Sequence, residues 1–112
     1  MTVRTQSILW VAQRASAAVL ALCVATHLAT MIYAVRGGLT AAEILARTQG
    51  NTAWFAFYSL FVAAIAVHVP IGLRAVFGEW LDWRGASRDA VLCFLALFLF
   101  FFGMRAVLGV FQ

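Results

Sequence analysis

The chain has few charged residues and no lysine. Only 11% of its 112 residues are charged, against about a quarter in soluble domains, while 65% are hydrophobic. This balance excludes an ordinary water-soluble domain and indicates that lipid is the main solvent. A chain of this length has room for one domain, residues 1–112, and no room for a separate soluble catalytic module.

The positive charge is also unusually distributed. Eight arginines stand against four acidic residues, for a formal net charge of +4, and they lie near the ends of apolar runs. Because they form no patch, we exclude nucleic-acid binding. The pattern is typical of a membrane protein that faces anionic lipid headgroups. No aspartate or glutamate lies in the middle of an apolar run, which counts against a small transporter subunit, the least favoured alternative.

Cysteine is scarce. Cys23 and Cys93 lie inside apolar stretches without the spacing of a metal site or a disulfide framework, so we predict that both are small buried hydrophobic residues. The sequence also has no cysteine cluster and no glycine-rich dinucleotide turn. This chain is therefore not expected to bind flavin or an iron–sulfur cluster itself.

Long apolar runs dominate what is present. A bilayer core about 30 Å thick requires roughly 20 apolar helical residues, and three segments qualify, at about 7–35, 52–77 and 88–111. Lipid offers the backbone no hydrogen-bond partners, so each should be a helix. The Thr40 to Glu43 pattern predicts a short interfacial helix between the first two spans. The expected fold is all-α, with three transmembrane helices.

The ends of these spans carry further expectations. Arg14 would not suit the core of a signal peptide, so the first span is predicted to be retained. Ser87 is expected to cap the third helix, with Asp89 in its first turn. The phenylalanine-rich third span is expected to face lipid.

The arginines divide unequally between the two ends of the predicted bundle. The positive-inside rule therefore places the N-terminus and the second loop in the cytoplasm and the C-terminus on the far side of the cell's inner membrane. The two groups are Arg4, Arg14, Arg74, Arg84 and Arg88 against Arg36, Arg47 and Arg105.

Both histidines, His27 and His68, fall inside spans, where an unpartnered ionisable group is costly. Neutral imidazole is a standard axial ligand of haem iron, so we predict that both bind this metal; hydrogen-bonded structural histidines are the alternative. With a rise of about 1.5 Å per residue, His27 lies roughly 20 Å deeper than Arg14, and His68 about 9 Å deeper than Arg74. The two levels favour two haems, each completed by a histidine from a partner chain.

Other polar positions could complete these sites. Gly72 and Arg74 follow His68 by four and six residues and are expected on nearly the same helical face. Gly72 would leave room for a macrocycle, and Arg74 could reach a haem propionate. Arg14 and Ser16 could hold a propionate or a quinone carbonyl. The alternatives are a helix–helix contact at Gly72 and arginines that extend to the headgroups.

Two short motifs carry a resemblance to a known family. The sequence has the form H-x-x-x-G-x-R from His68 to Arg74, and R-x-S from Arg14 to Ser16. Together they resemble the cytochrome b membrane-anchor subunits of succinate dehydrogenase and fumarate reductase, the complex II superfamily, over about residues 7–83. The resemblance implies that His68 binds haem b and that Arg14 and Ser16, with Trp10 beside them, line a quinone site. His27 is similar to a ligand of the dihaem members.

The resemblance also implies a function and partners. The chain would be a haem b-binding membrane anchor that passes electrons between an iron–sulfur subunit and membrane quinone, while a flavoprotein subunit oxidises succinate or reduces fumarate. It would contribute no catalytic headpiece. A second membrane anchor, either another copy or a different small chain, would complete it, and a docking surface is expected near Arg4, Trp80, Trp83 and Arg84. The alternative is a haem-free structural or quinone-binding anchor.

Overall fold

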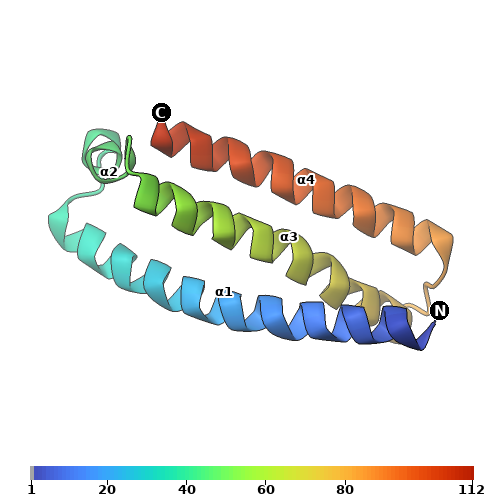
Figure 1. Ribbon diagram of the computed structural model, residues 1–112. Helices are drawn as coiled ribbons and strands as arrows, with labels where there is room; N and C mark the ends of the chain where they lie inside the picture. Colours follow the sequence, from blue (N-terminus) through green and yellow to red (C-terminus); the bar gives the residue numbers. More distant parts are fainter. Residues whose placement is uncertain (1) are drawn as a thin grey trace.

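The computed structural model describes residues 2–112 and contains helices without strands in that range. The helices are α1 (Val3–Gly37), α2 (Ala41–Thr48), α3 (Thr52–Trp80) and α4 (Ala86–Phe111) (Figure 1). Three of them, α1, α3 and α4, are long and apolar enough to cross a membrane. This confirms the predicted all-α fold with three spans and a short intervening helix. The observed helices extend a few residues beyond the predicted spans.

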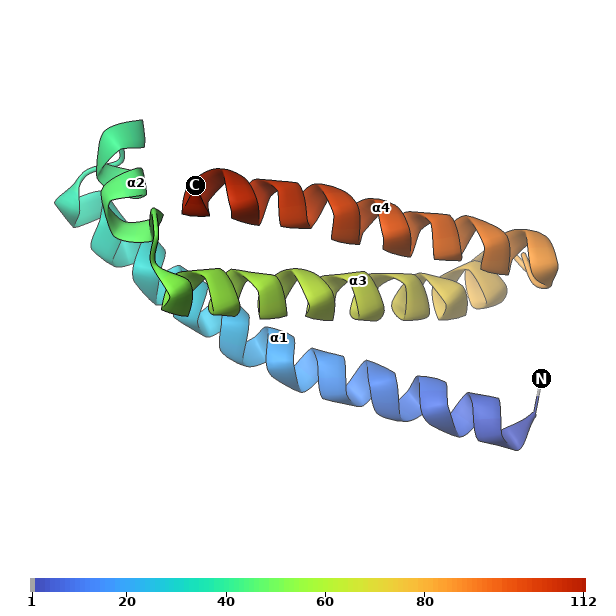
Figure 2. The same cartoon turned by 45° about the horizontal axis from the view of Figure 1, so that its top comes forward.

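The three long helices run side by side, with α3 between α1 and α4 (Figures 1 and 2). The short α2 lies at the end where α1 finishes and α3 begins, next to the C-terminus (Figure 1). The Gly50 amide donates a 2.7 Å hydrogen bond to the Phe111 carbonyl, which ties this end to α4. The N-terminus lies at the opposite end, beside the α3–α4 connection (Figure 1). The termini thus occupy opposite ends of the bundle, as the predicted topology requires.

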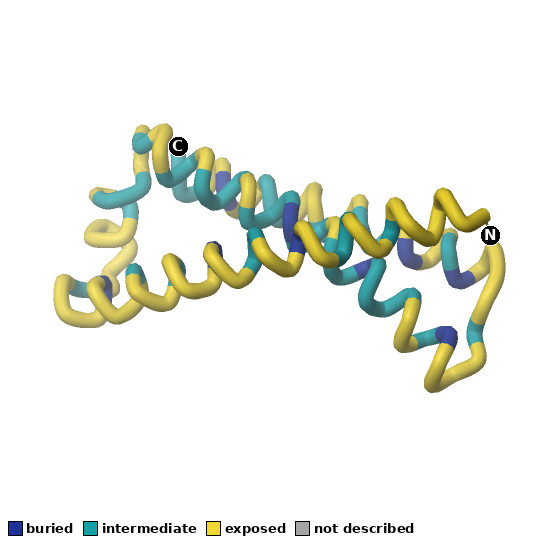
Figure 3. Tube along the Cα trace, turned by 60° about the horizontal axis from the view of Figure 1, so that its bottom comes forward, coloured by how far each residue is buried: buried dark blue, intermediate teal, exposed yellow. Residues whose placement is uncertain are grey.

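Very little of the chain is buried (Figure 3). The buried apolar side chains of residues 2–112 lie where the long helices meet; they are Cys23, Ala34, Ala64, Leu92 and Val107. The phenylalanines of α4 between residues 94 and 102 face outward, as predicted, with Phe94 71% exposed, whereas Phe111 packs against Phe55. Cys23 is buried as predicted, but the prediction for Cys93 was wrong because this residue lies on the outward face of α4. The exposed apolar surface suits lipid or neighbouring membrane chains.

The predicted capping box of α2 is confirmed. The Thr40 hydroxyl accepts a hydrogen bond from the Glu43 amide at 3.2 Å, and the Glu43 carboxylate accepts one from the Thr40 amide at 3.0 Å. These reciprocal bonds satisfy amides that the first helical turn leaves without partners.

The predicted cap at Ser87 was wrong. The helix begins two residues earlier than predicted, after Gly85, whose φ of +96° favours glycine. Ser87 lies inside the first turn, and its hydroxyl accepts a 2.9 Å hydrogen bond from the Trp83 indole. Asp89 does lie in the first turn, as expected, where it suits the helix dipole.

Candidate functional site

His68 lies on α3 and faces α1. Its Nδ1 is 3.3 Å from the hydroxyl oxygen of Ser16, which is only 6% exposed and also donates to the Gln13 carbonyl at 3.1 Å. The His68 ring itself is half-buried. Within residues 2–112, no hydrogen bond involves its second nitrogen, Nε2. The ring therefore has one nitrogen engaged with α1 and another available to a ligand.

Gly72 lies on the same side of α3 as His68, as the four-residue spacing predicts. A Cβ at Gly72 would lie 3.2 Å from the amide nitrogen of Gln13 on α1. The space beside Gly72 is thus occupied by α1. This agrees with the alternative that Gly72 serves a helix–helix contact. The amide oxygen of Gln13 is buried there and has no hydrogen-bond partner among the described residues.

Arg74 does not share the face of His68, so that prediction was wrong. Its Nε donates to the Asp89 carboxylate on α4 at 3.4 Å. Six residues turn a helix through about 600°, which leaves Arg74 roughly 120° away from His68 around α3. Since α1 and α4 lie on different sides of α3, the two side chains diverge.

The three predicted quinone-site residues separate into two groups. Arg14 stacks over the Trp10 ring, with its guanidinium carbon 5.0 Å from the ring centroid, and both side chains are exposed. Ser16 is only two residues from Arg14, but this spacing places it about 200° around the helix. Trp10 and Arg14 consequently form an outward pair, while Ser16 faces His68.

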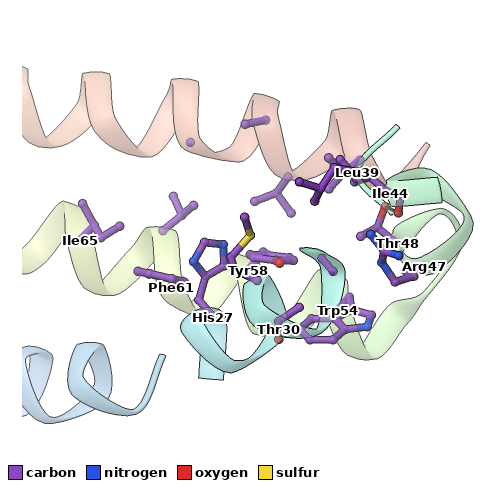
Figure 4. A pocket seen from close by; sticks show the side chains of 17 residues that line it. His27, Thr30, Leu39, Ile44, Arg47, Thr48, Trp54, Tyr58, Phe61 and Ile65 are labelled. Carbon is purple, nitrogen blue, oxygen red and sulfur yellow. Dashed lines mark hydrogen bonds between the residues drawn. The ribbon is translucent and has the colours of Figure 1, made fainter. Parts of the chain in front are cut away.

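His27 lies at the other end of the bundle and lines a cavity of about 440 Å³ (Figure 4). Its ring contacts Tyr58 and Phe61 edge to face, with centroid distances of 6.0 and 5.8 Å. The cavity walls come from all four helices and are mostly apolar, with Arg47 at the α2 side. Within residues 2–112, His27 makes these ring contacts and no hydrogen bond. Both ring nitrogens are therefore open to a ligand.

The aromatic side chains that line the cavity beside His27 were not predicted from the sequence. Trp54, Tyr58 and Phe61 follow one another at intervals of four and three residues. This spacing places them along one face of α3, and their aromatic character was the available signal. The Trp54 and Tyr58 rings stack with a centroid distance of 5.7 Å.

The predicted separation of the two histidines in depth is confirmed. His27 contacts α3 at Tyr58 and Phe61, whereas His68 is seven residues beyond Phe61. At about 1.5 Å per residue, this separates the two levels by roughly 10 Å or more along α3.

The donor set fits haem better than a bare metal ion. Residues 2–112 contain no group of three or more His, Cys, Asp or Glu side chains that could surround an ion. A haem supplies four of its own nitrogens and needs from the protein only axial ligands, such as imidazole. Each histidine here has a nitrogen without a protein hydrogen bond in mostly apolar surroundings, so each could hold the iron of a haem.

The expected docking residues lie near the N-terminal end of the bundle. Trp80 is 81% exposed, and Arg84 is exposed and pairs with Asp82 at 3.1 Å. Trp83 is held differently, because its ring stacks on Phe77 at 5.3 Å and is half-buried. Arg4 is exposed on the first turn of α1. These side chains leave a basic and aromatic surface at this end.

The sequence matches the family described as the succinate dehydrogenase/fumarate reductase transmembrane subunit, over residues 1–104. Comparisons with curated proteins and with solved structures found no match. Because the family match covers almost the whole chain, the chain belongs to this family, as its motifs predicted. It is a multi-pass membrane subunit of an oxidoreductase family, and catalysis does not reside in this subunit.

Proposed function

We propose that this member of the succinate dehydrogenase/fumarate reductase transmembrane subunit family binds haem b through His68 and His27. It would pass electrons between an iron–sulfur subunit and quinone in the membrane. The proposal rests on the burial of the two imidazoles and on their free ring nitrogens. Each is half-buried in an apolar helix and has at least one nitrogen without a protein hydrogen bond. Such groups are costly in a membrane unless a ligand completes them.

At the first level, His68 offers Nε2 while Ser16 engages Nδ1. At the second level, His27 projects into the cavity and is flanked by Tyr58 and Phe61 (Figure 4). A volume of about 440 Å³ lies within the range of cofactor sites, and the walls are mostly apolar. When bound, haem supplies reversible one-electron chemistry at iron; this chain supplies ligands, an apolar environment and orientation.

Each level offers one histidine of this chain, and we propose that a second membrane anchor supplies the other ligand of each haem. The extensive exposed apolar surface of α1 and α4 can accommodate such a partner as well as lipid. The partner is either another copy of this chain or a different small anchor that carries its own histidines.

The quinone would bind on the outward side of α1, near the N-terminal end. Arg14 can donate hydrogen bonds to a quinone carbonyl, and Trp10 offers a ring face beside it. The iron–sulfur and flavoprotein subunits would dock at the same end, against Arg4, Trp80 and Arg84. From the excess of arginine at this end, we propose that it lies in the cytoplasm and that the bundle lies in the inner membrane.

Histidine substitutions in the intact complex test the haem proposal. We expect His68→Ala and His27→Ala each to lose the haem at its own level, which would halve the b-type signal in a reduced-minus-oxidised spectrum. Val67→Ala and Thr26→Ala are matched controls, since both adjoin a histidine and are exposed. They should keep the full signal. Full haem content in both histidine variants would contradict the proposal.

One observation favours a second candidate, a haem-free structural anchor. The Ser16–His68 contact joins α1 to α3 through a buried hydroxyl, as a purely structural hydrogen bond would. In that case the intact wild-type complex would contain no b-type haem, and His68→Ala would weaken helix packing without a spectral change. The same spectra therefore separate the two functions.

A further inference from the structure

We propose that Ser16 is a positioning residue that holds the neutral His68 ring in the tautomer with its proton on Nδ1. This tautomer leaves the lone pair of Nε2 free for iron. The inference rests on the proposed function, because the haem ligand is assigned there. It gives Ser16 a role at the haem in place of the quinone role that its motif suggested.

The single proton of the Ser16 hydroxyl decides the tautomer of His68. The Ser16 hydroxyl has one proton and two neighbours, the Gln13 carbonyl at 3.1 Å and His68 Nδ1 at 3.3 Å. A carbonyl can only accept, so the shorter contact uses the hydroxyl proton. The Ser16 oxygen must then accept from His68, which requires the proton on Nδ1. The opposite tautomer would carry its proton on Nε2 and could not bind iron through that nitrogen.

The packing around Ser16 keeps this arrangement in place. Ser16 is 6% exposed, so little solvent competes for its hydroxyl. Its bond to Gln13 lies within α1 and orients the oxygen toward α3. One turn further along α3, Gly72 lets Gln13 approach closely. The α1–α3 contact therefore brings the hydroxyl to the ring without a flexible linker.

The two histidines differ in whether a protein group accepts a hydrogen bond from the ring. His27 is held by the edges of Tyr58 and Phe61 and has no hydrogen-bond acceptor for its ring among residues 2–112. When an imidazole binds a metal through one nitrogen, a hydrogen bond donated by the N–H of its other nitrogen raises the basicity of the ring and fixes the ring's rotation. The effect of Ser16 should be confined to the haem that His68 binds, whose midpoint potential it would lower.

Ser16→Ala in the intact complex tests this role, with Ser59→Ala as the matched control. Ser59 also has a buried hydroxyl, but that oxygen makes no hydrogen bond among the described residues. In Ser16→Ala we expect the His68-dependent haem to titrate at a higher midpoint potential and to be lost roughly tenfold faster in detergent. Ser59→Ala should leave both values unchanged. Unchanged potential and retention in Ser16→Ala would overturn the proposal.

A second measurement needs no haem. The full chain in lipid nanodiscs, labelled with ¹⁵N-histidine, gives signals from only two residues, and His27→Phe assigns them. We expect the Nδ1–H tautomer at His68 in the wild type and a shift toward Nε2–H in Ser16→Ala. An Nε2–H tautomer in the wild type would overturn the Ser16 proposal even if haem binds. Absence of haem from the intact wild-type complex would instead overturn the proposed function.

Discussion

Gly103 and Gly109 lie six residues apart on α4, but only Gly103 faces a neighbouring helix. A Cβ at Gly103 would lie 2.6 Å from a Val62 methyl group, whereas a Cβ at Gly109 would meet nothing within 4 Å. We expect Gly103→Ala to destabilise the α3–α4 contact by about 1–3 kcal/mol through overpacking. Gly109→Ala should be neutral or stabilising by up to about 1 kcal/mol. Thermal unfolding in detergent measures both, and equal effects would contradict this packing.

Asp89 is the carboxylate that links α3 to the start of α4. It accepts from Arg88 at 3.0 Å and from Arg74 at 3.4 Å, and Arg88 is only 8% exposed. Breaking a buried ion pair costs about 3–5 kcal/mol, but the Asp89 side chain is 49% exposed, so we expect about 1–2 kcal/mol for Asp89→Asn.

Asp82→Asn is the control for this prediction. Asp82 pairs with Arg84, but its side chain is 90% exposed, so its removal should cost little. Asparagine also tolerates the positive φ of 52° at this position. Unfolding curves for the two variants in detergent should differ; identical curves would show that the Asp89 network contributes no stability.

The residue-level site could be predicted from the sequence only in part. The presence of two histidines in spans, and their different depths, follow from composition and helical rise. The contact between Ser16 and His68 does not, because it depends on how α1 and α3 rotate against each other. Arg74 was assigned to the wrong face because six residues do not complete a whole number of helical turns.

At the scale of elements, the capping box of α2 is the most explicit signal in the sequence, and we expect the stability of this helix to depend on pH. The Thr40 amide and hydroxyl hold the pKa of Glu43 below its ordinary value, and the charge of Arg47 acts in the same direction. A carboxyl with a lowered pKa stabilises the folded state above its ordinary pKa. This stabilisation is lost as pH falls through the lowered value.

Acidification through that range should therefore open the capping box and speed amide exchange in α2. Amide chemical shifts and exchange rates from NMR would follow the change, with the Thr40 amide as the reporter. Glu43→Gln should remove the pH dependence because no carboxylate remains to titrate. The same pH response in this variant would mean that another group controls the start of α2.

The long helices were predictable because apolar runs of sufficient length have one stable structure in lipid. The residues at which these helices begin and end were less predictable. The start of α4 depends on the positive φ of Gly85 rather than on the serine two residues later. The outward position of Cys93 depends on which face of α4 packs against α3, which an almost uniformly apolar sequence does not specify.

At the scale of the whole molecule, the bundle has an arginine-rich end and an opposite end that carries α2 and the C-terminus. We predict that the first of these is cytoplasmic. In a Cys23→Ala, Cys93→Ala background, Gln112→Cys should react with a membrane-impermeant maleimide on spheroplasts. Gln6→Cys should react only after lysis in detergent. Labelling in the reverse pattern would invert the proposed orientation.

The exposed apolar surface suits neighbouring membrane chains as well as lipid, and the haem proposal assigns one histidine of this chain to each level. The family assignment implies soluble catalytic partners, and the haem proposal adds a second membrane anchor. If two histidine-bearing anchors share two haems, the complex should contain one haem for each anchor chain.

The most direct test of the haem proposal is therefore the haem content of the purified, intact wild-type complex. A pyridine haemochrome assay, combined with quantitation of all the anchor chains in the complex, gives the ratio. We predict b-type haem at about one per anchor chain, since two ligand pairs would be formed by two such chains. An intact and active complex that contains no haem would contradict it and leave the two histidines as structural groups.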